Sequence, residues 1–373
     1  MEWLVLMGAL MDLFFGLAGE ASDRQAKDDL KKRAEKDAGR KVNRRTNTID
    51  VALLGFGNVG RALARYTDED NRIRICAVAD SSGGVMLDSK AQFGRLLAHK
   101  QTGRSISNFA PASFIKDLPE FINSLSSAGV RVLVESLPTN LADGQPALDS
   151  IRSALACGIN VVTVDKGPLA AGFDALKEAA RTGNSNFAYS GTTGVQIPDE
   201  LKGERVLEIR GVLNGTTNYI LTEMQERNIS FGEALGKAQA DGIAEPDPSL
   251  DVEGWDTAVK ILILAKTLMG ADAKLSDVSR IGIGAQTGEL IKSARARGCI
   301  VRLVGRARHW QGRVRVSVAP KLIAPESVFY SVEGTSKLAV FRTEANGEVT
   351  AFARSGRDAI SQTIMDDIIK VAG

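Results

Sequence analysis

The chain has 373 residues, of which 44% are hydrophobic and 25% are charged, as is ordinary for a globular protein. This length suffices for two domains or for one large domain. A net charge of +2 argues against a dedicated nucleic-acid binder, which usually carries a strong basic excess, so we expect no nucleic-acid partner. The two histidines, His99 and His309, have no metal-like partner at helical spacing. Acid–base chemistry is therefore expected from Lys, Asp, Glu or Tyr.

The three cysteines, Cys76, Cys157 and Cys299, lie far apart and form no CxxC pair. This spacing indicates neither a zinc site nor a disulfide framework. We predict buried, reduced thiols, as in a protein of the cytoplasm.

The first 48 residues differ in composition from the rest. Residues 1–19 are almost wholly apolar, but Asp12 interrupts the run, which is shorter than the ~20 residues that a membrane span needs. Glu2 stands where a secretory signal has a positive charge. Residues 20–48 are polar and highly charged. We expect a poorly ordered extension; membrane contact through residues 1–19 and a cleaved signal are the alternatives.

From residue 49 the pattern is that of alternating strands and helices. Apolar runs at residues 49–54, 73–79, 130–134 and 161–164 predict buried strands, and residues 146–156 have helical periodicity. Strands that alternate with helices imply parallel βαβ units. We therefore predict an α/β fold that opens with a Rossmann-type dinucleotide-binding domain at residues 49–188.

The pattern changes after residue 205. A strand at 206–213 precedes helical stretches at 219–227 and 231–240 and a long helix from 251 to about 269. Residues 300–318 and 328–354 alternate like antiparallel strands, and residues 357–371 are helical again. We predict a second, α+β domain for catalysis and dimerisation at residues 189–354, with residues 355–373 returning to the first domain.

A GxGxxG motif follows the first predicted strand and opens a helix. Its first glycine permits a tight turn, its second lets a pyrophosphate approach the backbone, and its third lets helix and strand pack closely. The helix N-terminus favours the anionic pyrophosphate. A carboxylate at the end of the second strand is placed to accept from the ribose hydroxyls. The predicted cofactor-binding residues are Gly55, Gly57, Asn58, Val59, Gly60 and Asp80.

The same carboxylate bears on the choice of cofactor. Asp80 repels a 2′-phosphate, which favours NAD, but the donors of Ser81-Ser82-Gly83 and the basic residues after them leave NADP open. Reduced nicotinamide cofactor is supplied inside the cell, so we expect a cytoplasmic enzyme.

A stretch rich in carboxylates and prolines, Asp241 to Pro248, leads into the long predicted helix. Its prolines stiffen the loop and would hold Glu245 in place. Asp256 and Lys260 lie four residues apart and share one helix face. Such a pair is either an exposed ion pair of little energetic value or a functional pair. The apolar residues 261–265 indicate a buried helix, yet spacing alone leaves both readings open.

Several motifs together resemble the homoserine dehydrogenase family. They are Asn214-Gly-Thr-Thr-Asn-Tyr219, Ala244-Glu-Pro-Asp-Pro248 and Asp251 to Lys260, in this order after a GxGxxG domain. Val162-Thr-Val-Asp-Lys-Gly-Pro168 is similar to the family's strand-end motif VTANKGP. The similarity covers about residues 49–373, and it resembles a short, monofunctional form with no fused kinase and no ACT module.

The resemblance assigns roles residue by residue. Lys260 matches the catalytic lysine that exchanges a proton with the reacting oxygen, and Lys166 matches a second lysine near both nicotinamide and substrate. Glu245 and Asp256 match carboxylates that hold the substrate's ammonium group and position the lysine. The other matched positions, in the substrate-binding wall or the segment that closes over the cofactor, are Gly215, Thr216, Asp251 and Gly356.

These residues imply an enzyme that interconverts L-aspartate 4-semialdehyde and L-homoserine, in threonine, methionine and isoleucine biosynthesis, and that forms a homodimer. A cationic lysine suits this reaction because it polarises a carbonyl and supplies a proton. Thr216 or Thr217 is also expected to cap a helix. Another amino-acid dehydrogenase on the same scaffold, or a non-enzymatic nucleotide sensor at a membrane, are the alternatives.

Three positions depart from the family's pattern. Asp165 stands where Asn is common, and a carboxylate there is expected to pair with a lysine. Ile243 stands where an aromatic residue is frequent. Some members bind sodium through a glutamate and backbone carbonyls, and here Ser190 takes the glutamate's place. The sequence does not decide whether this protein binds a metal ion.

Overall fold

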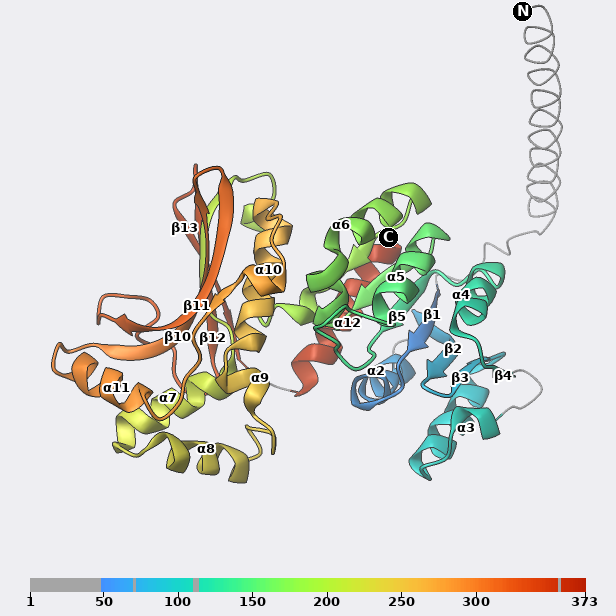
Figure 1. The fold of residues 1–373 in the computed structure, drawn as a ribbon. Coiled ribbons are helices and arrows are strands. Elements are labelled where there is room, and N and C mark those ends of the chain that lie inside the picture. The colour runs from blue at the N-terminus through green and yellow to red at the C-terminus, as the bar shows by residue number, and fades with distance from the viewer. Residues whose placement is uncertain (1–47, 70–71, 110–113, 355–356) are drawn as a thin grey trace, which may run out of the picture. The chain divides into compact units, whose positions relative to one another are not determined.

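The computed structural model describes residues 48–69, 72–109, 114–354 and 357–373, which contain two β-sheets (Figure 1). The expectations for an N-terminal extension and its membrane contact lie outside these residues. Of the helices that are described, none is long and apolar enough to cross a membrane. Thr48–Gly373 group into one compact unit, so the boundary predicted between residues 188 and 189 stays a prediction.

The first sheet has, among the described residues, seven strands in the order β4-β3-β2-β1-β5-β6-β7. The strands are β1 (Ile49–Leu54), β2 (Ile73–Asp80), β3 (Gly83–Met86), β4 (Phe114–Ile115), β5 (Val132–Glu135), β6 (Asn160–Thr163) and β7 (Phe187–Ala188). Strands β2, β1, β5, β6 and β7 are parallel neighbours, whereas β3 and β4 are antiparallel. The parallel core confirms the predicted Rossmann-type fold.

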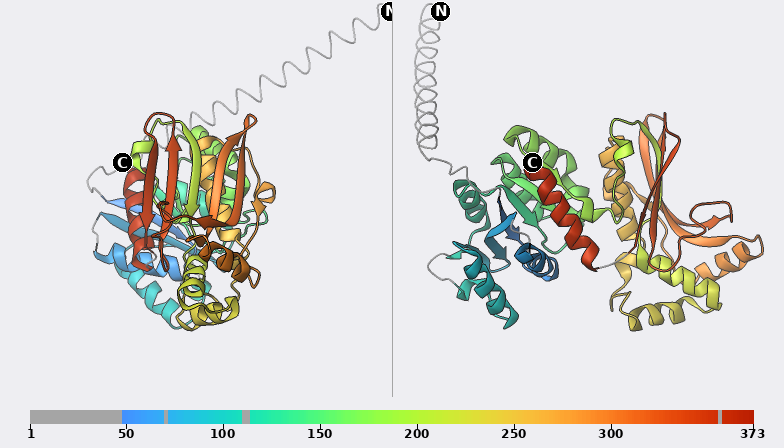
Figure 2. Two further views of the ribbon diagram at one scale, coloured as in Figure 1. Left: turned by 90° about the vertical axis from the view of Figure 1, so that its left-hand side faces the viewer. Right: turned by 180° about the vertical axis from the view of Figure 1, so that it is seen from behind.

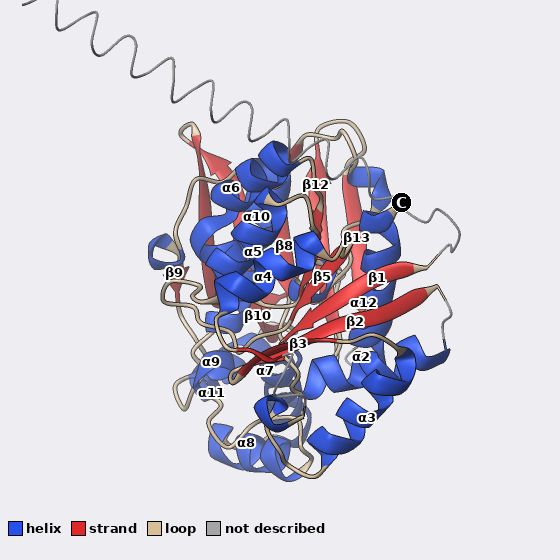
Figure 3. Ribbon diagram, turned by 90° about the vertical axis from the view of Figure 1, so that its right-hand side faces the viewer, coloured by secondary structure: helices blue, strands red, loops and turns tan. Residues whose placement is uncertain are grey.

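Helices cover both faces of this sheet (Figure 3). Their bounds are α2 (Asn58–Glu69), α3 (Lys90–Gln101), α4 (Leu118–Ser127), α5 (Ala147–Ala156), α6 (Lys166–Gly183) and α12 (Arg357–Ala372). In β1, Ala52 joins the buried cluster that contains α4 and α5 residues, whereas Val51 joins the cluster that contains α2 and α12 residues. Strand residues are apolar on both sides because successive side chains enter opposite layers.

The C-terminal helix α12 packs against the first sheet although the second sheet precedes it in the chain (Figure 2). It contacts α2, β5, β6 and β7. Ile364 and Ile368 are buried in one cluster with Val51 and Val134. The final segment therefore adds core to the cofactor-binding sheet.

The second sheet has, within the described part of the chain, six strands in the order β13-β12-β8-β10-β11-β9. They are β8 (Val206–Val212), β9 (Ser279–Arg280), β10 (Ile300–Trp310), β11 (Arg313–Ile323), β12 (Lys337–Thr343) and β13 (Glu348–Ala353). All pair antiparallel except β9, which runs parallel to β11.

Helix α10 (Trp255–Met269) ties this sheet to the rest, because it contacts β8, β10 and β11 and also α6. The run from Ile261 to Ala265 is completely buried. Each Ile or Leu buried in this way stabilises the fold by about 1.5–3 kcal/mol. The helix is thus a rigid support for the polar residues of its first turns.

The remaining helices are α7 (Gly215–Arg227), α8 (Phe231–Ala240), α9 (Ser249–Val252) and α11 (Thr287–Arg295). Helix α7 begins four residues earlier than predicted, and the expectation that Thr216 or Thr217 caps it was wrong. Asn214 is the N-cap, since its Oδ1 accepts from the Thr217 N–H at 2.8 Å. Asn is among the best N-cap residues, so the cap lies where the chain leaves β8.

The long helix predicted from residue 251 is interrupted. Helix α9 ends at Val252, and α10 starts only after Gly254, which has a φ of +84°. This left-handed conformation suits glycine and breaks the helical hydrogen-bond ladder.

The expectation of three buried thiols was also wrong. Cys76 is buried, but Cys157 is exposed at the C-terminal end of α5, and Cys299 is half-buried. Their spacing along the chain carried no information about burial.

Candidate active site

The loop between β1 and α2 has the geometry of a phosphate-binding turn. Gly55 has a φ of +99°, and a Cβ there would lie 2.5 Å from the Ser136 carbonyl oxygen. A Cβ at Gly60 would lie 2.5 Å from the Gly55 oxygen, whereas one at Gly57 would meet nothing within 4 Å. The first and third glycines are therefore required by close packing, and the second leaves open space beside a helix N-terminus. A dinucleotide pyrophosphate fits this arrangement.

The other predicted cofactor residues of this loop lie in the first turn of α2. Asn58 is exposed, and its Oδ1 accepts from the Arg61 guanidinium at 3.0 Å. Val59 is half-buried against the core. First-turn N–H groups have no acceptor inside the helix and are available to an anion. Gly356 lies outside the described residues.

Asp80 ends β2 next to this loop, because the Gly55 N–H donates to the Ala79 carbonyl at 2.9 Å. Its Oδ1 accepts from the Ser82 N–H and hydroxyl at 2.9 and 2.6 Å, and its Oδ2 accepts from Lys100 Nζ at 2.7 Å. Burial raises the pKa of Asp80, but the hydrogen bonds from Lys100 and Ser82 outweigh it and hold the pKa below its usual value. Asp80 is therefore anionic and already paired.

This pairing weakens the argument that Asp80 selects NAD. Lys100 neutralises part of the charge that would repel a 2′-phosphate, and both side chains are mostly buried. The donors of Ser82, which the sequence offered to a phosphate, point to Asp80 instead. The site is compatible with NAD and with NADP.

The second half of the candidate site is an aspartate–lysine pair on α10. Lys260 Nζ lies 2.5 Å from Asp256 Oδ2 and donates to the Leu213 carbonyl at 3.0 Å. The side chains of the pair are only 12% and 13% exposed, so this is no surface ion pair. The fold thus excludes the exposed reading that helical spacing had left open.

Asn214 joins two carboxylates to this pair. Its Nδ2 donates to Asp256 Oδ2 at 2.8 Å and to Asp251 Oδ1 at 2.6 Å, while its Oδ1 caps α7. One amide therefore positions three elements, namely α7, α9 and α10.

Lys166 completes the cluster from the helix that follows β6 of the first sheet. It is the first residue of α6, and its Nζ lies 3.4 Å from Asp256 Oδ1. The two lysines thus contact different oxygens of one carboxylate. Helix α6 covers the parallel sheet that carries the glycine loop, and it contacts α10, so the cluster lies where these two helices meet.

The charges of this cluster determine its protonation. Burial raises the pKa of Asp256, but the positive charges of Lys260 and Lys166 outweigh it and lower the pKa well below its usual range. Burial, with the nearby Asp256 charge, raises the pKa of Asp251. Asp256 is therefore a fixed anion between two cations.

Sequence reasoning missed a third lysine at this place. Lys337, the first residue of β12, is half-buried, and a Cβ built at Gly194 would lie 3.3 Å from Lys337 Cδ and 3.5 Å from Lys260 Cε. Burial and the charge of Lys260 lower the pKa of Lys337 to about 8. The one available signal was a lysine just before the apolar run from Leu338 to Phe341, which is too common a pattern to single out.

The predicted substrate-binding residues are only partly brought together. Gly215 opens α7 beside Asn214, and the Thr216 hydroxyl donates to the Ile243 carbonyl at 3.2 Å. Glu245 is exposed on the following loop, and no contact with Asp256 or Lys260 is found among the described residues. Its place at the substrate stays a prediction.

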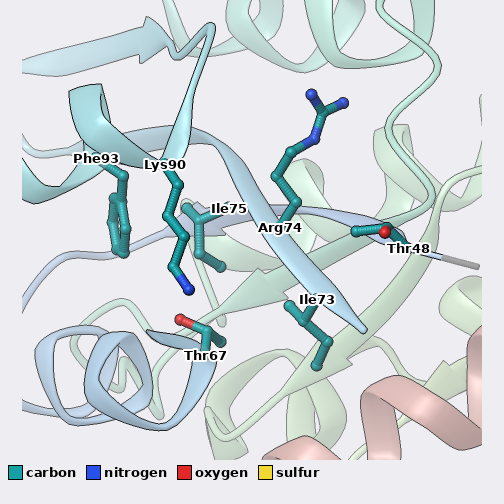
Figure 4. Close-up of a pocket in the computed structure, with 7 residues that line it drawn as sticks. All are labelled: Thr48, Thr67, Ile73, Arg74, Ile75, Lys90 and Phe93. Carbon is teal, nitrogen blue, oxygen red and sulfur yellow. The ribbon is translucent and has the colours of Figure 1, made fainter. Parts of the chain in front are cut away.

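A separate hollow of about 180 Å³ lies at the other end of the first sheet (Figure 4). It is lined by Thr48, Thr67, Ile73, Arg74, Ile75, Lys90 and Phe93. Thr48 precedes β1 and Ile73 begins β2, so the hollow lies at the amino ends of these strands. Ligands of parallel sheets bind at the carboxyl ends, and this hollow is therefore not the cofactor site.

Comparison with known proteins identifies the family. Residues 196–369 match the family described as homoserine dehydrogenase, and residues 55–190 match the NAD binding domain of homoserine dehydrogenase. The chain is 32% identical over 348 residues to the homoserine dehydrogenase of Methanocaldococcus jannaschii, covering 87% of this chain and 98% of that protein. This chain belongs to the homoserine dehydrogenase family.

Other relatives agree. The chain is 33% identical over 338 residues to the NAD(+)-dependent homoserine dehydrogenase of Pseudomonas canavaninivorans, covering 86% and 95% of the two chains. The crystal structure of a putative homoserine dehydrogenase from Archaeoglobus fulgidus aligns with a TM-score of 0.74 and 29% identity over 87% of this chain and all of that one. This homoserine dehydrogenase family member is thus an NAD(P)-dependent oxidoreductase that acts on a CH–OH group.

Asp165, which stands where the family commonly has Asn, has a different partner from the one expected. Asp165 forms no ion pair with Lys166 among the described contacts; it is the N-cap of α6, and its Oδ1 accepts from the Gly167 N–H at 2.9 Å. Lys166 pairs with Asp256 instead. The added carboxylate of this family member therefore orients the helix that presents Lys166.

Ser190, at the position of the family's sodium-binding glutamate, is also engaged. Its N–H and hydroxyl donate to the carboxylate of Asp367 on α12, at 3.0 and 2.8 Å. No group of three or more His, Cys, Asp or Glu residues that could hold a metal occurs in the described ranges. Ser190 therefore connects the end of β7 to the C-terminal helix.

A buried carboxyl beside the cofactor loop was also missed. Glu135 ends β5 and is fully buried; its oxygens accept from the Leu137 N–H at 2.6 Å and the Thr163 hydroxyl at 2.5 Å. Burial and the charge of Asp165 raise the pKa of Glu135 to about 8. Among the described residues no cation pairs with it, so it is mostly protonated at neutral pH.

Proposed function

We propose that this chain interconverts L-homoserine and L-aspartate 4-semialdehyde with NAD or NADP. The observation that carries the proposal is the cluster in which Lys260 and Lys166 contact opposite oxygens of the buried Asp256. Such a cluster combines a proton donor with a fixed counter-charge.

Lys260 is proposed as the group that exchanges a proton with the reacting oxygen. An ammonium has three N–H donors, and two of those on Lys260 are taken by Asp256 and the Leu213 carbonyl. The third is left for the oxygen of the substrate, where it polarises the aldehyde and then transfers its proton. When bound, the nicotinamide supplies the hydride for reduction and accepts it in the reverse direction.

Lys166 and the carboxylates are proposed to orient the substrate. Lys166 reaches the cluster from α6, which follows β6 of the cofactor-binding sheet, and this supports a position for its ammonium near both nicotinamide and amino acid. Glu245, stiffened by its proline neighbours, is proposed to receive the substrate's ammonium group with Asp251. Gly215 and Thr216 form the adjacent wall. The glycine loop, Asn58, Val59, Asp80 and Gly356 are assigned to the dinucleotide.

The test is oxidation of L-homoserine, followed as NADH or NADPH formation, in wild type and in Lys260→Met. We expect turnover by the wild type and a loss of kcat of about 100- to 10,000-fold in the variant. Lys266→Met on the same helix is the matched control and should keep wild-type rates.

Two results would overturn the proposal in different ways. Normal turnover by Lys260→Met refutes the role of the lysine. A wild type that ignores L-homoserine but oxidises other amino alcohols or reduces keto acids replaces the substrate and favours another amino-acid dehydrogenase.

We also propose that the enzyme is a cytoplasmic homodimer that pairs through the antiparallel strands of the second sheet. The support is an exposed apolar side chain on an edge strand, Phe352 of β13, which is 56% exposed. Light scattering at micromolar concentration checks this, and a monomer would contradict it.

A further inference from the structure

Lys337 presents a third ammonium to the catalytic cluster. It stands one residue before the β12–β8 pair Leu338–Val212, so it lies beside Leu213, whose carbonyl accepts from Lys260. Gly194, with a φ of +76°, separates the Lys337 and Lys260 side chains because its missing Cβ leaves both room. Lys337 is thus built into the wall of the site.

In the described part of the chain, the Lys337 ammonium has no acidic side chain in direct contact with it. No hydrogen bond or ion pair of Lys337 is found among the described residues, whereas the oxygens of Asp256 are taken by Lys260, Lys166 and Asn214. A half-buried ammonium without a partner is costly. The lowered pKa of Lys337 reflects this cost. A ligand that brings an anionic group next to Lys337 would remove it.

We propose that Lys337 binds the carboxylate of the amino-acid substrate. This inference rests on the proposed function, because a zwitterionic amino acid carries both an ammonium and a carboxylate. Glu245 and Asp251 supply the acidic partner for the ammonium, and Lys337 supplies the basic partner for the carboxylate. Both charged groups stand on the α-carbon, so these contacts hold that end of the substrate. The reacting carbon, two bonds further along the chain, then lies towards Lys260.

The phosphates of the cofactor are the other anions to consider. The pyrophosphate site is at the glycine loop of the first sheet, and a 2′-phosphate would lie near Asp80 at the end of β2. Lys337 belongs to the second sheet and lies next to Lys260, where hydride and proton are exchanged with the substrate. The substrate carboxylate is therefore the anion that fits this position.

The experiment compares two ligands that differ only in this charge. KM is measured for L-homoserine, and an inhibition constant is measured for L-homoserine amide, in which an uncharged carboxamide replaces the carboxylate. Lys337→Met should raise the KM of homoserine about 10- to 100-fold, as expected for the loss of a charged hydrogen bond. The inhibition constant of the amide and the KM of the cofactor should change less than about twofold.

Controls separate binding from folding. Lys337→Arg keeps the charge and should recover most of the affinity for homoserine. Lys321→Met, at an exposed position of β11, should behave as wild type. Lys337→Gln replaces the Met variant if circular dichroism shows that the latter is unfolded.

The outcomes are distinct. An unchanged KM for homoserine, or an equal loss for homoserine and its amide, overturns the inference. A rise in cofactor KM alone assigns Lys337 to a cofactor phosphate and also overturns it. If the wild type does not oxidise homoserine at all, the proposed function fails, and this is visible before any variant is made.

Discussion

Two aspartate–lysine pairs of this enzyme have nearly the same contact and different surroundings. Asp80 and Lys100 meet at 2.7 Å at the carboxyl end of β2, and Asp256 and Lys260 meet at 2.5 Å on α10. Both pairs are mostly buried, and in both the aspartate's pKa is lowered despite burial.

The difference lies in the second oxygen of each carboxylate. In Asp80 the other oxygen is filled by the N–H and hydroxyl of Ser82, two residues away. In Asp256 the other oxygen faces Lys166, a second cation from a distant part of the chain. Both oxygens of Asp80 are bound by residues within 20 positions of it in the chain. Asp256 instead binds one lysine of its own helix and one lysine of α6. The partners that surround an ion pair, rather than the contact itself, therefore indicate whether the pair is functional.

The largest effect is expected from a substitution that breaks the Asp256–Lys260 pair. Asp256→Asn removes the counter-charge that Lys260 and Lys166 share, so kcat for homoserine oxidation should fall about 100- to 10,000-fold. Asp80→Asn is the matched variant in the other pair and should change kcat at saturating cofactor less than about fivefold. Steady-state kinetics measure both variants. A similar loss of kcat in the two would show that the Asp256 pair is no more important for catalysis than the Asp80 pair.

A smaller effect is expected from the cofactor-side pair. Lys100→Met leaves Asp80 anionic without its cation, which should raise the preference for NAD over NADP about 10-fold, the value of about 1.4 kcal/mol of charge repulsion. Asp80→Asn should shift the preference the opposite way. The ratio of kcat/KM for the two cofactors is the measurement. A ratio that is unmoved by both variants means that Asp80 does not face the ribose.

The last prediction concerns stability rather than activity, and a carboxyl that pairs with no lysine among the described residues. Glu135 has its pKa raised to about 8 from an ordinary value of 4.5, first by burial and then by Asp165. Between pH 4.5 and 8 the folded state therefore binds more protons than the unfolded state. The contribution of Glu135 to the free energy of unfolding is full below pH 4.5 and is lost as the pH rises through 8. Stability should fall by up to about 1.4 kcal/mol per pH unit in that window.

Glu135→Gln tests this directly. Glutamine keeps the shape without the ionisation, so the variant should lose this pH dependence in denaturant unfolding measured between pH 5 and 9. Glu326→Gln, at an exposed position, should retain it. Identical pH profiles for wild type and Glu135→Gln would show that the carboxyl does not titrate in this range.

Local patterns were enough to predict β1, β2, β5 and β6 of the first sheet, but they did not predict β3, β4 and β7. The strand at Ile49–Leu54, the glycine loop and the helix after it depend on neighbours in the chain, through alternation, missing Cβ atoms and helix start signals. The break at Gly254 and the cap at Asn214 were missed, although Gly and Asn suit these positions, because apolar periodicity does not mark where one helix ends and the next begins.

The candidate site divides in the same way. The sequence alone determined the glycine loop, the carboxylate that ends β2 and the Asp256–Lys260 spacing, since a helix places residues four apart on one face. Only the tertiary structure decided that this pair is buried, that Lys166 reaches the same carboxylate, and that Lys337 stands beside Lys260. The physical reason is that spacing and turn geometry act over a few residues, whereas burial and charge coupling depend on which distant segments pack together.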